Sequence, residues 1–131
     1  MSGVYVDTSA LVKLVIEEPE SAALRDYLGV AGRMYASRIA AVELRRAVRR
    51  LRQRAASEQA ELVIGTLRLI ELDDELARAA GEAQPITLRT LDAIHLSAAL
   101  ALGDECAAFV SYDNRLSQAA RQARLEVRAP A

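Results

Sequence analysis

The chain has 131 residues, 52% of them hydrophobic, which is sufficient for one globular domain over residues 1–131 with a continuous core. The 17 Lys and Arg residues nearly balance the 18 Asp and Glu residues, so the total charge gives no reason to expect a polyanionic partner. The single cysteine, Cys106, excludes an internal disulfide and a cysteine metal cluster. Without a basic leader or an unbroken apolar span, we expect a soluble, cytoplasmic protein that does not enter a membrane.

Apolar spacing and turn residues predict strands that alternate with helices along the chain. In chain order we expect a strand at 4–6, helices at 9–17 and 19–28, a strand at 34–36, helices at 38–51 and 57–64, a strand at 67–72, helices at 74–83 and 91–102, a strand at 107–111, a helix at 115–123 and a short strand at 125–127. Because no tight hairpin turns join the strands, we predict an α/β fold with three layers, α/β/α, around a central parallel sheet of about four to five strands.

Short polar residues and glycines predict where several helices begin and end. The expected N-caps are Thr8 or Ser9, Ser37 and Thr90. Gly29 and Gly32 mark the expected end of the second helix.

Four acidic residues are expected at one edge of the sheet. Asp7 and Asp113 follow strands, and ligands of open parallel sheets bind beyond the carboxyl ends of the strands. Asp92 lies in the first turn of a helix, and Glu43 borders the apolar face of another. Four such carboxylates repel one another unless they take up protons or bind a cation.

The expected cation is Mg²⁺ or Mn²⁺, because oxygen ligands select these ions and the chain lacks the second histidine or cysteine of a zinc site. A water with a lowered pKa could then attack phosphorus while the ion offsets charge on the phosphate oxygens. The pattern therefore points to phosphodiester hydrolysis without a protein nucleophile.

Around these acids the sequence resembles the PIN-domain family, and most of all its VapC toxins. The four matching segments are VYVDTSAL around Asp7, AVEL around Glu43, LRTLDAIHL around Asp92 and FVSYDNRL around Asp113. Their order and spacing match over nearly the whole chain. Any single motif is weak, whereas all four in order are fairly specific.

The resemblance implies a PIN-like fold and a Mg²⁺- or Mn²⁺-dependent endoribonuclease acting on tRNA or rRNA. It also implies a homodimer that is inhibited by a VapB-type antitoxin, the tail of which occupies the active-site cleft. In this family Ser9 and Ser111 match positions with hydroxyls close to the metal site.

Arginines are the candidate substrate contacts. Arg46, Arg49 and Arg50 belong to a basic stretch of one helix, and arginine suits bidentate phosphate binding, although a solvated face explains such a run equally well. Arg115 lies beside Asp113 and is expected to contact substrate or to brace the acids.

Taken singly, the acids have ordinary explanations as helix caps, helix-surface ion pairs or turn residues, and only their joint order indicates a site. His95 shares a helix face with Asp92 and could orient a water, but we expect it to be a hydrogen-bonded packing residue. We expect Cys106 to be a small buried hydrophobe.

Three other functions were weighed. A phosphoacceptor receiver domain needs a late lysine, but the only lysine is Lys13. A haloacid-dehalogenase-type phosphatase needs an aspartate where this chain has Ser9. The third alternative is a catalytically inactive PIN-fold module that binds RNA or a protein partner.

Overall fold

The computed structural model describes residues 2–131, in which five strands form one parallel sheet. The strands are β1 (Gly3–Val6), β2 (Arg33–Ser37), β3 (Leu67–Ile70), β4 (Cys106–Val110) and β5 (Val127–Arg128). Their order across the sheet is β3-β2-β1-β4-β5, and every neighbouring pair is parallel. The predicted parallel sheet is confirmed, and its order places the carboxyl ends of β1 and β4 side by side.

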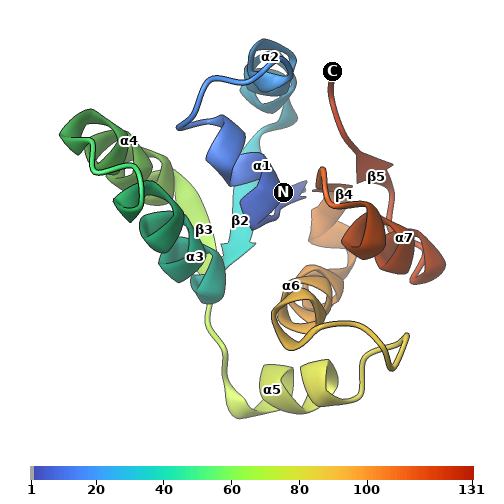
Figure 1. The fold of residues 1–131 in the computed structure, drawn as a ribbon. Helices are drawn as coiled ribbons and strands as arrows, with labels where there is room; N and C mark the ends of the chain where they lie inside the picture. Colours follow the sequence, from blue (N-terminus) through green and yellow to red (C-terminus); the bar gives the residue numbers. More distant parts are fainter. Residues whose placement is uncertain (1) are drawn as a thin grey trace.

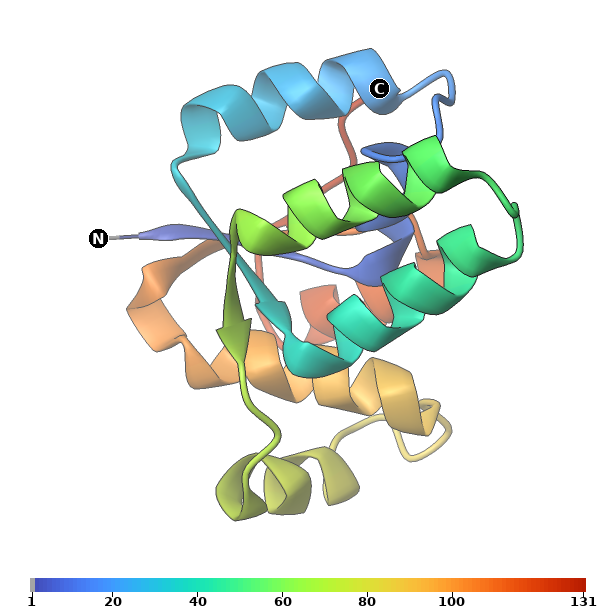
Figure 2. The same ribbon diagram turned by 90° about the vertical axis from the view of Figure 1, so that its left-hand side faces the viewer.

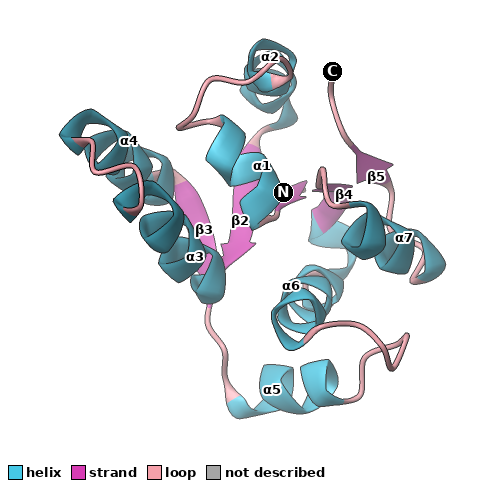
Figure 3. Cartoon of the chain, in the orientation of Figure 1, coloured by secondary structure: helices cyan, strands magenta, loops and turns pink. Residues whose placement is uncertain are grey.

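Within residues 2–131, seven helices cover the two faces of the sheet (Figures 1 and 3). They are α1 (Thr8–Lys13), α2 (Ser21–Ala31), α3 (Arg38–Arg49), α4 (Arg54–Gly65), α5 (Asp74–Gly81), α6 (Thr90–Ala101) and α7 (Asn114–Gln122), with a 3-10 turn at Gly103–Glu105. Helices α1 to α4 pack on one face and α5 to α7 on the other, which confirms the three-layer arrangement.

The alternation of side chains along β1 explains the two separate cores. Successive residues of a strand point to opposite faces of the sheet. Val4 and Val6 accordingly pack with α1 to α4, whereas Tyr5, which is fully buried, packs with α5 to α7 and stacks on Phe109 of β4.

Two predicted helix starts were wrong. Helix α1 is capped by Asp7, because its carboxylate accepts a hydrogen bond from the Ala10 backbone N–H, which leaves the Thr8 and Ser9 hydroxyls available for other partners. Helix α6 begins at Thr90 itself, and Arg89 at the N-cap position forms no side-chain cap. The predicted cap Ser37 is confirmed, since its hydroxyl accepts from the Ile39 backbone N–H.

Several predicted ends also differ. Helix α2 continues through Gly29, and only Gly32 ends it, with a φ of 87° that suits glycine. Helix α3 stops at Arg49, two residues before the predicted end, because the chain turns there with Arg52 at a φ of 54°. Figure 2 shows the resulting hairpin, with α3 and α4 lying side by side.

Across residues 2–131, none of the helices has both the length and the apolar character needed to cross a bilayer.

Candidate active site

The candidate site lies at the carboxyl edge of the sheet, where β1 and β4 end next to each other. Asp7 directly follows β1, and its backbone N–H donates to the carbonyl of Val110, the last residue of β4, at 3.1 Å. Asp113 lies three residues farther on and caps α7 by accepting from the Leu116 backbone N–H at 2.9 Å. The predicted neighbourhood of these two strand ends is confirmed.

Asp7 is held on both sides by serine hydroxyls. Ser9 donates to Oδ1 at 2.6 Å and Ser111 donates to Oδ2 at 2.7 Å, while the Asp7 side chain is almost completely buried. Burial raises the pKa of the Asp7 carboxyl, although the hydrogen bonds from the two serines oppose that shift. The carboxylate is therefore fixed in orientation but costly to keep charged.

The same two serines connect Asp7 to the segment that carries Asp113. Ser9 Oγ accepts from the Tyr112 backbone N–H at 2.9 Å, and Ser111 Oγ accepts from the Asp113 backbone N–H at 3.1 Å. Each hydroxyl thus donates to one acid and accepts from the backbone near the other. This geometry gives Ser9 and Ser111 a definite role in positioning the acids.

Glu43 is held by a second network that crosses from one helical layer to the other. The Thr8 hydroxyl donates to Glu43 Oε1 at 2.7 Å, and His95 Nε2 lies 2.8 Å from the same oxygen. His95 Nδ1 lies 2.7 Å from the Tyr5 hydroxyl, which accepts from the Ser37 backbone N–H at 3.0 Å.

The hydrogen bonds assign one tautomer to His95. Since the buried Tyr5 hydroxyl already accepts from Ser37, its own proton goes to Nδ1 of His95, and Nε2 then carries the proton that is donated to Glu43. Half-burial raises the pKa of the Glu43 carboxyl, but the hydrogen bonds from His95 and Thr8 outweigh burial and leave the pKa below its ordinary value. Glu43 is therefore held as a carboxylate.

Asp92 lies in the first turn of α6 and connects the two networks through its charge. Burial raises the pKa of the Asp92 carboxyl, the negative charge of Asp113 raises it further, and Glu43 adds a smaller contribution. Asp92 therefore lies close enough to Asp113 and Glu43 for their negative charges to oppose its ionisation.

The acids are nevertheless arranged around an open edge and do not form a closed shell. Within residues 2–131, no three acidic, imidazole or thiol groups lie close enough to hold one ion together. Both oxygens of Asp7, and one oxygen each of Glu43 and Asp113, accept hydrogen bonds from the protein. The donor set still fits Mg²⁺ or Mn²⁺, because all its ligands are carboxylate oxygens and Asp92 and Asp113 repel each other.

The candidate arginines separate into two groups. Arg115 lines a hollow that also includes Asp92, so it lies next to the acids. Arg46, Arg49 and Arg50 line another hollow with Arg52, at the far end of α3, which contains none of the four acids. The structure therefore brings only Arg115 to the site itself.

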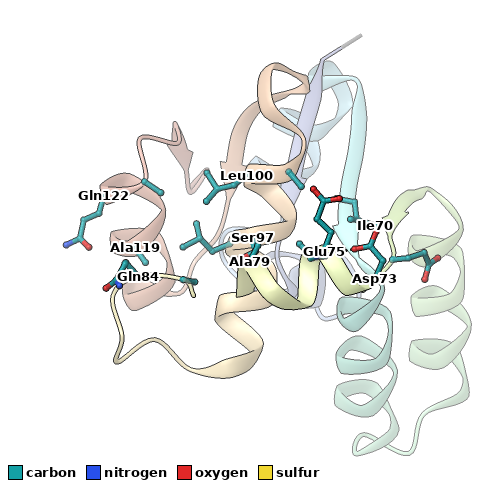
Figure 4. Close-up of a pocket in the computed structure, with 15 residues that line it drawn as sticks. Ile70, Asp73, Glu75, Ala79, Gln84, Ser97, Leu100, Ala119 and Gln122 are labelled. Atoms are coloured by element: carbon teal, nitrogen blue, oxygen red, sulfur yellow. Dashed lines mark hydrogen bonds between the residues drawn. The ribbon is translucent and has the colours of Figure 1, made fainter. Parts of the chain in front are cut away.

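A predominantly apolar hollow lies away from the acids. It lies between α5, α6 and α7, has a volume of about 630 Å³, and includes Ser97, Leu100 and Ala119 (Figure 4). None of the four acids lines it.

Sequence reasoning missed three contributors to the site. Thr8 carried a signal, since a hydroxyl next to Asp7 that does not cap the helix is available to bind another acid. His95 carried only its place on the helix face of Asp92, and Tyr5 carried no signal, because the two residues lie 90 positions apart and meet through the packing of α6 on the sheet. His95 is hydrogen-bonded as predicted, and one of its partners is a candidate site residue.

Comparison with known proteins gives a consistent family. A family model described as PIN domain matches residues 4–122. Ribonuclease VapC47 of Mycobacterium tuberculosis (strain CDC 1551 / Oshkosh) is 41% identical over 123 residues, which cover 91% of this chain and 90% of that protein. Ribonuclease VapC46 of Mycobacterium tuberculosis (strain ATCC 25618 / H37Rv) is 38% identical over 130 residues, covering 99% of each.

Solved structures share the fold at low sequence identity. The crystal structure of VapC20 from Mycobacterium tuberculosis gives a TM-score of 0.71 at 18% identity, covering 89% of this chain and 95% of that one. VapBC2 from Rickettsia felis, bound to a promoter DNA fragment, gives 0.69 at 16% identity and covers 98% of each chain. With the family match over most of its length and these sequence relatives, the chain belongs to the PIN-domain family, among its VapC-like members.

Proposed function

We propose that this protein is a divalent-metal-dependent endoribonuclease and the toxin of a VapBC-type toxin–antitoxin pair. The observation that carries the proposal is the edge where β1 and β4 end side by side: Ser9 and Ser111 join the buried Asp7 to the segment that carries Asp113, and the negative charge of Asp113 opposes ionisation of Asp92. A cation relieves such repulsion, and the curated relatives are named ribonucleases.

Asp7, Glu43, Asp92 and Asp113 would hold Mg²⁺ or Mn²⁺. When bound, the ion supplies a water of lowered pKa and offsets charge on the phosphate oxygens. The chain's own hydrogen bonds supply orientation: the serines fix Asp7, and Thr8 with His95 fixes Glu43. Preorganised ligands of this kind cost little rearrangement at the moment of reaction.

Arginines would place the RNA. Arg115 lies next to Asp92 and is suited to hold a phosphate close to the acids. Arg46, Arg49 and Arg50 are exposed and form no ion pair within the part of the chain that the structure describes. They would bind the RNA backbone at a distance from the cut, in tRNA or rRNA.

The proposed partners follow from the relatives. One structural neighbour is a VapBC assembly, and we infer that a VapB-type antitoxin binds this chain and covers the acidic edge. We also infer that the chain forms a homodimer, as the family resemblance implies.

Cleavage of a mixed tRNA and rRNA pool by pure, antitoxin-free protein tests the proposal directly. Fragments should appear with Mg²⁺ or Mn²⁺ and be absent with a chelator. Asp7→Asn and Asp92→Asn should abolish cleavage while circular dichroism shows an intact fold, since asparagine retains the shape but not the charge. RNA that stays intact with either ion would favour the inactive binding module, and full activity in either variant would place the site elsewhere.

A further inference from the structure

A second hollow opens beside Asp92, between the start of α6 and the exposed face of α7, and we call it the α6–α7 hollow. It has a volume of about 390 Å³. Its walls include Arg89 and Asp92 on the α6 side and Arg115, Gln118 and Gln122 on the α7 side. Because Asp92 belongs both to this hollow and to the acidic edge of the sheet, a group bound in the hollow would lie next to that edge.

The α7 wall is one continuous polar stripe. Arg115, Gln118 and Gln122 are spaced three and four residues apart, which puts their side chains on one face of the helix. All three are exposed, and within residues 2–131 the side-chain amides of Gln118 and Gln122 form no hydrogen bond. Two free amides offer both donors and acceptors, the combination that reads the edge of a nucleobase.

The charges of the hollow remain available for an anion. Within the described chain, Arg89 and Arg115 form no ion pair with Asp92 or with any other acid. The positive charge of Arg89 still acts on Asp92, since it lowers the pKa of that carboxyl in opposition to burial. A guanidinium in this position can hold a phosphate or stack on a base.

The volume and the apolar surface of the hollow fit a ligand the size of a single nucleotide. Sites for small molecules have volumes of about 300–1,000 Å³, and 390 Å³ lies near the lower limit. The half-buried Pro85 and Leu88 add apolar surface against which the face of a base can lie. Each glutamine taken alone is an ordinary solvated surface residue. The grouping of two amides and two guanidinium groups without ion pairs around one hollow beside Asp92 is what indicates a binding site.

We propose that the α6–α7 hollow binds the nucleotide next to the scissile phosphate and reads its base through Gln118 and Gln122. This inference rests on the proposed ribonuclease function. Arg89 and Arg115 would hold the phosphates that flank this base. Sequence choice at one position of the RNA would then come from α7, while the acids supply the chemistry.

The first test measures base choice. Wild-type protein and Gln118→Leu are incubated with an RNA of randomised sequence and Mn²⁺, and the fragment ends are sequenced. Wild-type cleavage should prefer certain bases at a position next to the cut, and Gln118→Leu should lower that preference about five- to thirtyfold. Gln59→Leu, on α4, is the matched control and should retain the wild-type preference. An unchanged preference in Gln118→Leu would overturn the subsite and leave the ribonuclease function standing.

The second test does not depend on cleavage. The four nucleoside 5′-monophosphates, and inorganic phosphate for comparison, are titrated into metal-free protein while the glutamine side-chain amides are followed by NMR. Shifts at Gln118 and Gln122 that depend on the base would support the subsite even if no RNA is cut. Equal shifts with inorganic phosphate would mean that the hollow binds phosphate alone, and base reading would be overturned. Absence of any shift at millimolar nucleotide would overturn the subsite as well.

Discussion

Single carboxylates in this protein serve two purposes at once. Asp7 and Asp113 cap helices through backbone N–H groups, and they are also candidate metal ligands. Asp7, Glu43 and Asp113 each accept hydrogen bonds from the protein, which offset part of the cost of placing their charges at one edge of the sheet. Asp92 forms no side-chain hydrogen bond within residues 2–131, and the charge of Asp113 raises the pKa of its carboxyl.

The raised pKa of Asp92 predicts how stability depends on pH. An acid with a folded-state pKa above its unfolded value of 3.8 contributes stability that is fully present below pH 3.8 and lost as pH rises through the folded pKa. Asp92→Asn cannot ionise. Its free energy of unfolding relative to wild type should therefore increase between pH 3.8 and neutral pH, as measured by urea denaturation in chelator.

Glu43→Gln is expected to show the opposite pH dependence of stability and serves as a control for Asp92→Asn. The pKa of Glu43 is lowered, so its carboxylate contributes stability above the unfolded value of 4.5 and loses it as pH falls through the folded pKa. The stability of Glu43→Gln relative to wild type should therefore decrease as pH rises. Curves for the two variants that run in the same direction would contradict the assigned environments.

The Tyr5 hydroxyl is predicted to stabilise the fold as well as to orient His95. Tyr5→Phe leaves the Ser37 backbone N–H and His95 Nδ1 without a partner in a buried position, which costs about 1–3 kcal/mol. Tyr112→Phe removes a comparable hydroxyl that donates to the Pro130 carbonyl, but water can replace it at this half-buried position. Urea denaturation should give a clearly larger loss for Tyr5→Phe, and equal losses would disprove the buried network.

At the scale of helices and strands, the sequence predicted types better than boundaries. Short apolar runs indicated where the strands lie, because strands of a parallel sheet are covered by helices on both faces. The end of α3 could not be predicted, since Leu51 continues the apolar spacing but is 38% exposed beyond the turn. The end of such a helix depends on how far its neighbours extend to pack against it, and the local sequence carries no information about that packing.

Replacement by alanine is expected to change the free energy of unfolding in opposite directions at two glycines. A Cβ on Gly3 of β1 would lie 2.3 Å from the backbone carbonyl oxygen of Arg33 in β2, whereas a Cβ on Gly29 in α2 would meet nothing within 4 Å. Gly3→Ala should lower the free energy of unfolding by about 1–3 kcal/mol. Gly29→Ala should raise it by about 0.5–1 kcal/mol, because alanine loses less backbone entropy in a helix. Shifts of the same sign in urea denaturation would contradict the strand pairing.

For the whole molecule, the near-neutral total charge conceals an uneven distribution. Arg46, Arg49, Arg50 and Arg52 surround one hollow of about 700 Å³ at the end of α3, away from the acids. The net charge could not predict this separation of arginines from acids, because the separation depends on where α3 ends and the chain turns. The sequence predicted the edge position of Asp7 and Asp113 from strand ends, but the polar wall of α7 beside Asp92 required the packing of two helices.

The arginine cluster predicts a salt-dependent contribution to RNA binding. Replacement of Arg46, Arg49 and Arg50 by alanine removes three exposed charges. Each phosphate contact with single-stranded RNA contributes about 0.7 to the slope of log affinity against log salt, so the slope should decrease by about 2. Binding is measured in chelator, where the RNA stays intact.

The matched control replaces Arg25, Arg38 and Arg78, each of which already pairs with an acid. The same number of charges is removed, but few phosphate contacts should be lost. Equal changes of slope in the two triple variants would mean that only total charge matters.

Titration calorimetry of Mn²⁺ into the metal-free protein tests the acidic edge most directly. Wild type should bind the ion and unfold at a higher urea concentration in its presence, whereas Asp7→Asn and Asp92→Asn should lose most of both effects. Saturable binding of equal strength in wild type and both variants, or none in wild type, would contradict a metal site built from these carboxylates.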